Sequence, residues 1–251
     1  MKNMTISAKL FIGATVTAGA VALASGLLQW ESKDPVRWLW FLIIAAVASR
    51  LKVKLPGTTG TMSVNLPFIL IALAELSFSE TLVIAAVCAF VQGLPDKGRK
   101  LKPVQAAFNV STLVVAVAGA GLVYTRAAGV PSLAAKSLLI ALAGAAFLVA
   151  DTLPVAGVIA LTENFNLVKV WREMVELTFS YFALSAGIAA IATTARPYVG
   201  WQTPLLVLPV MIMTYVSYRR YFRVQAVAAI ANLQFATLPA GAREKAQVEH
   251  Y

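Results

Sequence analysis

Two acidic residues within apolar segments are the side chains best suited to chemistry in this chain. Asp151 lies in the apolar segment 132–161, and Glu75 lies in the segment 66–78. An acid in lipid is costly, and it must meet a cation, a proton or a hydrogen-bond donor, so both are candidate ligand-binding residues. The structural alternatives are a helix cap for Asp151 and an interfacial group near the outer helix end for Glu75.

Four uncharged polar residues are further candidates for ligand binding: Thr61, Ser63, Asn65 and Asn109. An amide offers both donors and an acceptor, so the two asparagines could orient a ligand where water is excluded. Alternatively, these side chains only form hydrogen bonds between helices. Glu80 is predicted to be structural, because it follows Ser79, a helix-capping type, at the start of an apolar segment.

Catalytic and metal-binding motifs are missing from the sequence. Cys88 is the only cysteine and His250 the only histidine, which excludes a CxxC site and argues against a zinc, haem or Ser/His/Asp site. The sequence also lacks GxSxG, HExxH and P-loop patterns. We therefore predict no cofactor and no enzyme activity, although a membrane-embedded lipid enzyme built on scattered polar residues is a third-ranked alternative.

The composition is that of a membrane protein. Hydrophobic residues make up 59% of the chain and charged residues 13%, and the mean hydropathy is +0.77. The apolar residues fall into eight segments, at 10–30, 38–49, 66–78, 81–94, 104–125, 132–161, 177–194 and 203–218. The sequence thus predicts an all-α polytopic membrane protein with about eight (six to eight) transmembrane helices. Residues 1–222 form the membrane domain, and 223–251 form a partly helical cytoplasmic tail.

The basic residues predict the orientation of these helices. With a cytoplasmic N-terminus, sixteen of the 21 Lys and Arg residues fall in inside loops and five in outside loops. This bias favours eight crossings of a bacterial cytoplasmic membrane with both termini inside. It also accounts for the net charge of +10 without nucleic acid. Membrane lipids are the predicted partners of the basic residues that end the last segment, Arg219, Arg220 and Arg223.

Residues 50–66 alternate apolar and polar side chains on both sides of a Pro-Gly-Thr-Thr-Gly turn. Such period-two alternation predicts a short β-hairpin. In lipid its strand edges would be unsatisfied, so it must lie at the interface or against the bundle. We interpret it as a lid whose apolar side packs on the bundle, above a cavity that holds the candidate residues. A plain connector is the alternative.

Two stretches have features that a simple transmembrane helix lacks. The segment 132–161 is too long for one span and contains Asp151, Thr152 and Pro154, so a break or sharp kink is expected between Ala150 and Pro154. Residues 166–177 carry alternating charged and apolar side chains before the seventh segment. They are expected to form an amphipathic interfacial segment that precedes the seventh span and has a solvated charged face.

Several stretches resemble the membrane-integral N-terminal region of bacterial signalling proteins with HD, HD-GYP or GGDEF output domains. They are KLPGTTGTMSVNLPFILIALAELSFSETL, KPVQAAFNVSTL, VIALTENFNLVKVWRE and GWQTPLLVLPVMIMTYVSYRRY, and the likeness covers roughly residues 8–222. The resemblance implies a sensory input module whose last helix passes a signal to a cytoplasmic enzyme. This sequence departs from the pattern after Arg223, where no HD pair, GYP or GGDEF follows, so either signalling needs a separate cytoplasmic output protein or the sequence is part of a longer protein.

A second, weaker resemblance is to the substrate-binding S components of energy-coupling factor vitamin transporters. It rests on SRLKVKLPGTTGTMSVNLPFILIALAELSF, an extended Leu-Pro stretch between two helices that would lid a substrate. In that family the stretch lies outside, whereas the charge distribution here places it inside. The leading hypothesis is therefore a membrane-integral sensing module for an unknown small molecule, and the alternative is a substrate-binding transporter component with a coupling protein.

Overall fold

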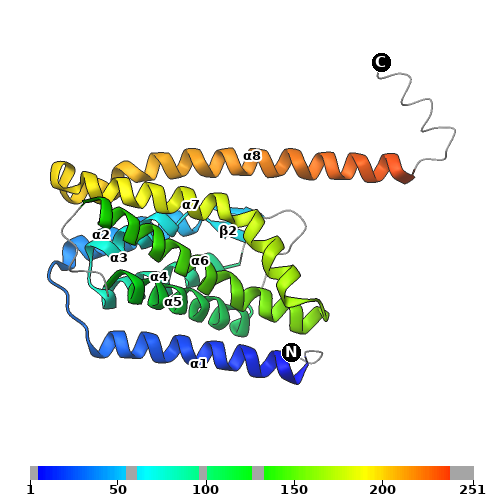
Figure 1. Ribbon diagram of the computed structural model, residues 1–251, viewed down its shortest axis with the longest axis horizontal. Coiled ribbons are helices and arrows are strands. Elements are labelled where there is room, and N and C mark those ends of the chain that lie inside the picture. The colour runs from blue at the N-terminus through cyan, green and yellow to red at the C-terminus, as the bar shows by residue number, and fades with distance from the viewer. Residues whose placement is uncertain (1–4, 55–60, 96–100, 126–132, 238–251) are drawn as a thin grey trace, which may run out of the picture.

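The structure is a computed structural model that describes residues 5–54, 61–95, 101–125 and 133–237, without the side chains of 54, 61, 133, 134, 201 and 225–237. Within these residues the chain folds into eight α-helices, one short hairpin and one 3-10 turn, η1 (Gly200–Gln202) (Figure 1). The helices are α1 (Ile6–Leu28), α2 (Pro35–Ser49), α3 (Leu66–Glu75), α4 (Phe78–Gly93), α5 (Pro103–Thr125), α6 (Leu133–Glu163), α7 (Leu167–Val199) and α8 (Thr203–Thr237). Each of the eight predicted apolar segments coincides with one helix, which confirms the all-α prediction.

Four of the helices, α1, α5, α6 and α7, are long and apolar enough to cross a membrane. This agrees with a membrane protein. The helices α2, α3 and α4 are shorter, with 15, 10 and 16 residues. At 1.5 Å per residue, α3 is only about 15 Å long, half the thickness of a hydrocarbon core. Helix length therefore establishes four candidate spans and leaves the predicted six to eight as a proposal.

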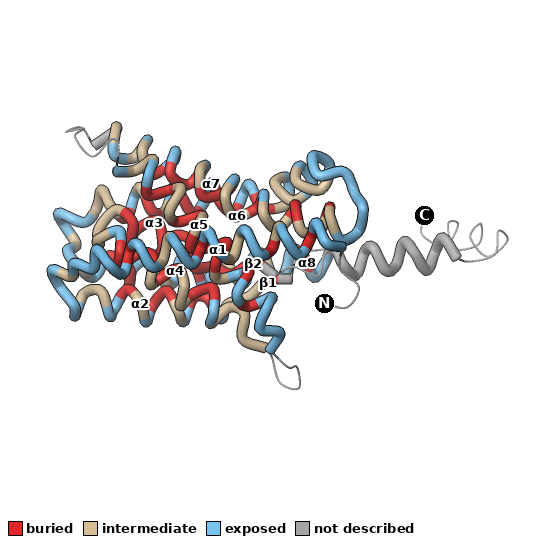
Figure 2. The backbone as a smooth tube through the Cα atoms, turned by 90° about the horizontal axis from the view of Figure 1, so that it is seen from below, coloured by how far each residue is buried: buried red, intermediate tan, exposed pale blue. Residues whose placement is uncertain are grey.

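The core of the bundle is built around α3. All eight residues from Leu66 to Leu73 are buried, and α3 contacts α2, α4, α5, α6, α7 and α8. A helix that is apolar on every side is expected at such a central position. Figure 2 shows the buried residues gathered in the middle of the bundle, while α1 and α8 cover opposite sides of it (Figure 1).

The predicted hairpin is confirmed in the described residues. Strand β1 (Lys52–Lys54) pairs antiparallel with β2 (Thr61–Ser63), and Val53 lies opposite Met62. Both of these apolar side chains are buried, as the alternation predicted. The turn at 55–60 lies outside the described residues. The hairpin therefore packs its apolar side on the bundle, but its polar residue Ser63 is buried too.

The sixth segment is not discontinuous, so this form of the predicted break is wrong, and the sharp kink between Ala150 and Pro154 stays a prediction. Helix α6 runs without interruption from Leu133 to Glu163 and includes Pro154, so Asp151 does not cap a new helix. The hydroxyl of Thr152 donates to the carbonyl of Leu148 (2.6 Å) and accepts a hydrogen bond from the indole of Trp171 (3.0 Å). Extensive packing against α5 and α7 offsets the cost of the proline, about 3 kcal/mol in an isolated helix.

Residues 166–177, predicted as an amphipathic interfacial segment before the seventh span, form the N-cap and the first turns of α7. The Asn166 side chain caps this helix by accepting from the backbone N–H groups of Val168 (2.9 Å) and Lys169 (3.2 Å). No glycine or proline interrupts the following apolar residues up to Ala186. The amphipathic stretch and the apolar stretch therefore form one helix of 33 residues.

The bundle has two distinct ends. At one end, which we call the hairpin end, β1 and β2 meet the ends of α2 and α4, because Arg50 and Lys52 donate to the carbonyls of Val91 (3.3 Å) and Leu94 (3.0 Å). At the other, the start of α2, the end of α3 and the end of α7 meet at Arg37, Glu75 and Arg196. We call it the arginine end.

Candidate ligand-binding site

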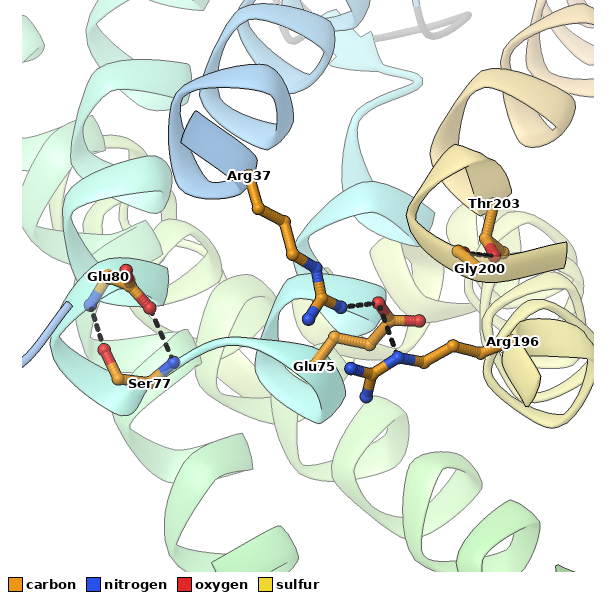
Figure 3. Close-up of polar contacts among 7 residues, drawn as sticks. All are labelled: Arg37, Glu75, Ser77, Glu80, Arg196, Gly200 and Thr203. Carbon is orange, nitrogen blue, oxygen red and sulfur yellow. Dashed lines mark hydrogen bonds and ion pairs between the residues drawn. The ribbon is translucent and has the colours of Figure 1, made fainter. Parts of the chain in front are cut away.

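Glu75 is bound by two arginines at the arginine end of the bundle. Arg37 of α2 donates from Nη2 to Oε2 of Glu75, and Nε of Arg196 on α7 lies 3.6 Å from the same oxygen (Figure 3). We call these three residues the arginine cluster. In the sequence, Arg37 and Arg196 lie 38 and 121 positions from Glu75, so only the packing of α2, α3 and α7 brings the three residues together.

Local helix signals place two members of the arginine cluster. Asp34 caps α2 by accepting from the backbone N–H of Arg37 (3.0 Å), and Pro35 is the first helical residue, so Arg37 lies in the first turn of that helix. Glu75 is the last residue of α3, because Leu76 is extended. These helix ends place both side chains at the arginine end of the bundle, where the Arg37 guanidinium contacts the Glu75 carboxylate.

Helix α4 begins directly after Glu75 with a capping box. Its cap is Ser77 rather than the expected Ser79: Ser77 accepts from the backbone N–H of Glu80 (3.2 Å), and Glu80 accepts from that of Ser77 (2.8 Å) (Figure 3). The hydroxyl of Ser79 instead donates to the carbonyl of Gln29 (3.0 Å). The structural role predicted for Glu80 is confirmed.

The arginine cluster carries more positive than negative charge. Glu75 is almost completely buried, with 2% of its side chain exposed, whereas Arg37 and Arg196 are 15% and 44% exposed. Oε1 of Glu75 and Nε of Arg37 are buried and have no hydrogen-bond partner within the described residues. Such groups cost about 1 to 3 kcal/mol each. The arrangement therefore favours an additional polar group that supplies an acceptor and a donor.

Arg196 also belongs to the turn that joins α7 to α8. Its carbonyl accepts from the backbone N–H of Gly200, which caps α7 at a φ of 74°, a conformation that favours glycine. The Thr203 hydroxyl, at the first residue of α8, donates to the carbonyl of Gly200 (2.7 Å) (Figure 3). Arg196 therefore lies at the turn that leads directly into α8.

The hairpin end holds a second, uncharged group of polar residues. Asn65 donates from Nδ2 to the Ser49 hydroxyl (3.0 Å) and accepts at Oδ1 from the Ser63 hydroxyl (2.9 Å). Oε1 of Gln92 on α4 also lies 2.9 Å from the Ser63 hydroxyl. Together with Tyr181 we call these residues the hairpin network. Asn65 and Ser63, which were predicted to face a ligand or the interface, thus contact each other in a buried hydrogen bond.

Tyr181 connects the hairpin network to α7 and α8. Its hydroxyl donates to the carbonyl of Ser63 (2.8 Å) and accepts from the backbone N–H of Leu66 (3.2 Å). Its ring stands edge-on to that of Tyr218 on α8, with 6.4 Å between the ring centres. A single buried side chain therefore contacts the hairpin, the start of α3 and the last helix.

Of the other predicted ligand-binding residues, Asn109 and Asp151 form no hydrogen bond with these two groups within the described residues, but Asp151 interacts electrostatically with Tyr181. Asn109 is exposed on α5, and Asp151 is half-buried on α6. The side chain of Thr61 lies outside the described residues. No hydrogen bond within the described residues joins Asn109 or Asp151 to Asn65 or Glu75. The six candidates thus do not assemble into one site beneath the hairpin, and Glu75 lies at the opposite end of the bundle from Ser63 and Asn65.

Sequence reasoning missed the roles of Arg37, Arg196 and Tyr181. A signal for the two arginines existed, because the charge distribution placed both on the same predicted side of the membrane as the end of the segment that holds Glu75. Tyr181 gave no comparable signal in an apolar stretch. For the predicted lipid-binding residues, Arg219 donates to the Tyr215 hydroxyl (3.1 Å), and Arg220 and Arg223 are exposed.

No protein family, curated protein or solved structure matches this chain. The resemblances to signalling and transporter membrane regions therefore remain expectations from sequence stretches alone. Function has to be argued from the arginine cluster, the hairpin network and the course of α8.

Proposed function

We propose that this protein is a membrane-integral sensing module of a bacterial signalling system. A small molecule binds at the arginine end, and α8 carries the response to a partner at the hairpin end. The observation that carries this proposal is the course of α8. This helix begins at the turn beside Arg196 and continues for 35 residues, about 52 Å, past the hairpin end of the bundle (Figure 1).

The proposed ligand is a small anion, because the arginine cluster pairs two guanidinium groups with one carboxylate. An anionic group can replace the Glu75 carboxylate at Arg196, the more exposed and weaker of its two partners. Bidentate arginine contacts are suited to carboxylates and phosphates. Because Arg196 adjoins the turn that starts α8, this exchange alters the position of α8.

The same proposal includes eight membrane crossings with the hairpin end in the cytoplasm. The short helix α3 completes its crossing together with β2 and residues 64–65, whose backbone is surrounded by protein; Ser63, Val64 and Asn65 are buried. Irregular backbone is tolerated at membrane depth when protein covers it. Basic loops at this end support a cytoplasmic location.

Labelling of single introduced cysteines tests this orientation. Positions 2, 97 and 245 are expected to be protected from a membrane-impermeant reagent in intact cells. Tyr198→Cys, at the arginine end and 90% exposed, is expected to react with it. The buried native Cys88 stays unlabelled. Reaction at position 97 in intact cells would contradict the proposed orientation.

The coupling between Glu75 and α8 is tested by spin labels at Leu10→Cys and Arg220→Cys, two exposed positions on α1 and α8. We expect the interspin distance in lipid nanodiscs to change with Glu75→Gln, which weakens the pairing with Arg196. The control is Glu176→Gln, which removes an exposed ion pair with Arg172 on α7. Identical distance distributions for the wild type and Glu75→Gln would refute the coupling.

A second candidate is the substrate-binding component of a small-solute transporter. The observation that favours it is the hairpin between α2 and α3, which matches the extended stretch that prompted the S-component likeness. Copurification with an ATPase pair and a coupling protein would support transport. Copurification with a cytoplasmic signalling enzyme, lost on truncation of α8 after Arg223, would support sensing.

A further inference from the structure

An apolar groove of about 410 Å³ runs between α1, α4 and α5 on the outer surface of the bundle. Its walls include Val16 and Leu23 of α1, Phe90 of α4 and Val110 of α5. The hydroxyl of Ser111, the polar side chain in its lining, donates to the carbonyl of Val16 (3.4 Å). The groove therefore offers contacts to hydrocarbon and no polar recognition along its length.

Close packing at one point and small side chains beside it create the groove. A Cβ at Gly19 would lie 2.4 Å from the Cβ of Ser111, so α1 and α5 touch there. The neighbouring residues Ala20, Ala106 and Ala107 are too small to fill the space on the outer side of this contact. The hollow is thus a product of how α1 packs on the bundle.

The length of the groove matches one leaflet of a bilayer. Its lining on α5 extends from Leu101 and Pro103 to Val114. Eleven residue steps along the helix from Pro103 cover about 17 Å, and one leaflet contributes about 15 Å of hydrocarbon. An extended acyl chain that enters from the lipid therefore follows the groove for its full depth.

Positive charge marks the open end of the groove. Lys102 is exposed between the lining residues Leu101 and Pro103. In the sequence, three further basic residues lie within the five positions before it: Lys97, Arg99 and Lys100. Each basic residue near a membrane surface attracts anionic lipid by about 1 kcal/mol. The hydrocarbon groove and the basic residue at its mouth complement the two parts of one anionic phospholipid.

We propose that this groove is a binding site for an anionic phospholipid, with one acyl chain between α1 and α5 and the headgroup at Lys102. This site is distinct from the arginine cluster, which lies at the other end of the bundle. Its occupant bridges α1, which is mostly exposed, to α4 and α5. The bound lipid thereby stabilises the packing of α1 against the rest of the bundle.

The test is native mass spectrometry of the full chain released from nanodiscs that contain equal amounts of phosphatidylglycerol and phosphatidylcholine. The wild type is expected to retain one phosphatidylglycerol. Ala107→Trp and Ala20→Trp, which fill the groove from either wall, are expected to lose it. Ala145→Trp is the control, because Ala145 is equally exposed to lipid on α6 but does not line the groove.

The headgroup contact is tested in the same way. Lys102→Gln should lower the preference for phosphatidylglycerol about fivefold, while Lys136→Gln, an exposed lysine at the start of α6, should leave it unchanged. Melting temperatures of all variants identify any that fail to fold. Equal retention of both lipids by the wild type, undiminished retention by both tryptophan variants, or a dimer that these variants abolish would overturn the proposal.

Discussion

The arginine end and the hairpin end both bury polar side chains, but they satisfy them differently. In the hairpin network, Ser49, Ser63, Asn65 and Tyr181 are uncharged, and each has a hydrogen-bond partner at 2.8 to 3.2 Å. In the arginine cluster, one carboxylate is shared by two arginines, and one oxygen and one guanidinium nitrogen are left without a partner. The first arrangement is complete, and the second is not.

Under the proposed function, this difference separates a structural group of residues from a binding site. A complete neutral network has nothing to gain from a ligand, because a new partner must displace an existing hydrogen bond. A charged cluster with unpaired buried atoms gains when a polar ligand enters. Four substitutions test this contrast.

Removing the carboxylate of Glu75 is expected to have the largest effect on stability. Glu75→Leu leaves the largely buried Arg37 without its anion and should lower the free energy of unfolding by about 3 to 5 kcal/mol. Denaturation in mixed micelles measures it. The double variant Arg37→Leu/Glu75→Leu should recover most of the loss. A double variant no more stable than the single one would show that the pair is not the cause.

Removing the amide of Asn65 is expected to cost less. Asn65→Leu leaves Ser49 and Ser63 without one partner each and should lower the free energy of unfolding by about 1 to 3 kcal/mol. Asn109→Leu, at an exposed position of α5, should change it by less than about 0.5 kcal/mol. Neither variant should alter the spin-label distance between α1 and α8. If a ligand changes this spin-label distance and only Asn65→Leu abolishes the change, the ligand binds at the hairpin end instead.

Tyr181→Phe removes one hydroxyl from the hairpin network while the ring stays in place. The expected loss of stability is about 1 to 2 kcal/mol, because the carbonyl of Ser63 and the N–H of Leu66 lose their partner. Hydrogen exchange at the amide of Leu66 should become faster, with amides in α6 as the internal control. Unchanged exchange at Leu66 would show that this N–H has another acceptor.

The smallest effect is expected at the exposed pair Arg172 and Glu176 on α7, whose Nε and Oε1 are 2.8 Å apart. Arg172→Ala should change the free energy of unfolding by less than about 0.5 kcal/mol. The value should shrink further in high salt. A loss comparable with that of Glu75→Leu would mean that burial does not explain the contrast between these ion pairs.

Local patterns in the sequence were sufficient for the secondary structure. Eight apolar segments became eight helices, and the alternation around the turn at 55–60 became the pairing of Val53 with Met62. Helix starts at Asp34 and Ser77 follow ordinary capping rules. These features depend on residues a few positions apart, so composition and periodicity specify them.

Contacts between distant segments were beyond the reach of these patterns. Asp151, Thr152 and Pro154 predicted a break in α6, but packing against α5 and α7 holds the helix together. Asn109 was expected to face a cavity, yet α5 is apolar on nearly all sides, so periodicity does not tell which side faces the protein. Such choices depend on the shape of neighbouring helices.

Composition and local patterns were enough to predict an apolar, helical chain, a hairpin at 50–66 and, in Glu75, an acid that needs a partner. Which partners Glu75 has depends on how the helices pack. Arg37 and Arg196 are 38 and 121 residues away from Glu75, and the Tyr181 hydroxyl reaches 118 residues back to Ser63. Side-chain type determines what a buried group needs, whereas the packing of whole helices determines what comes within its reach.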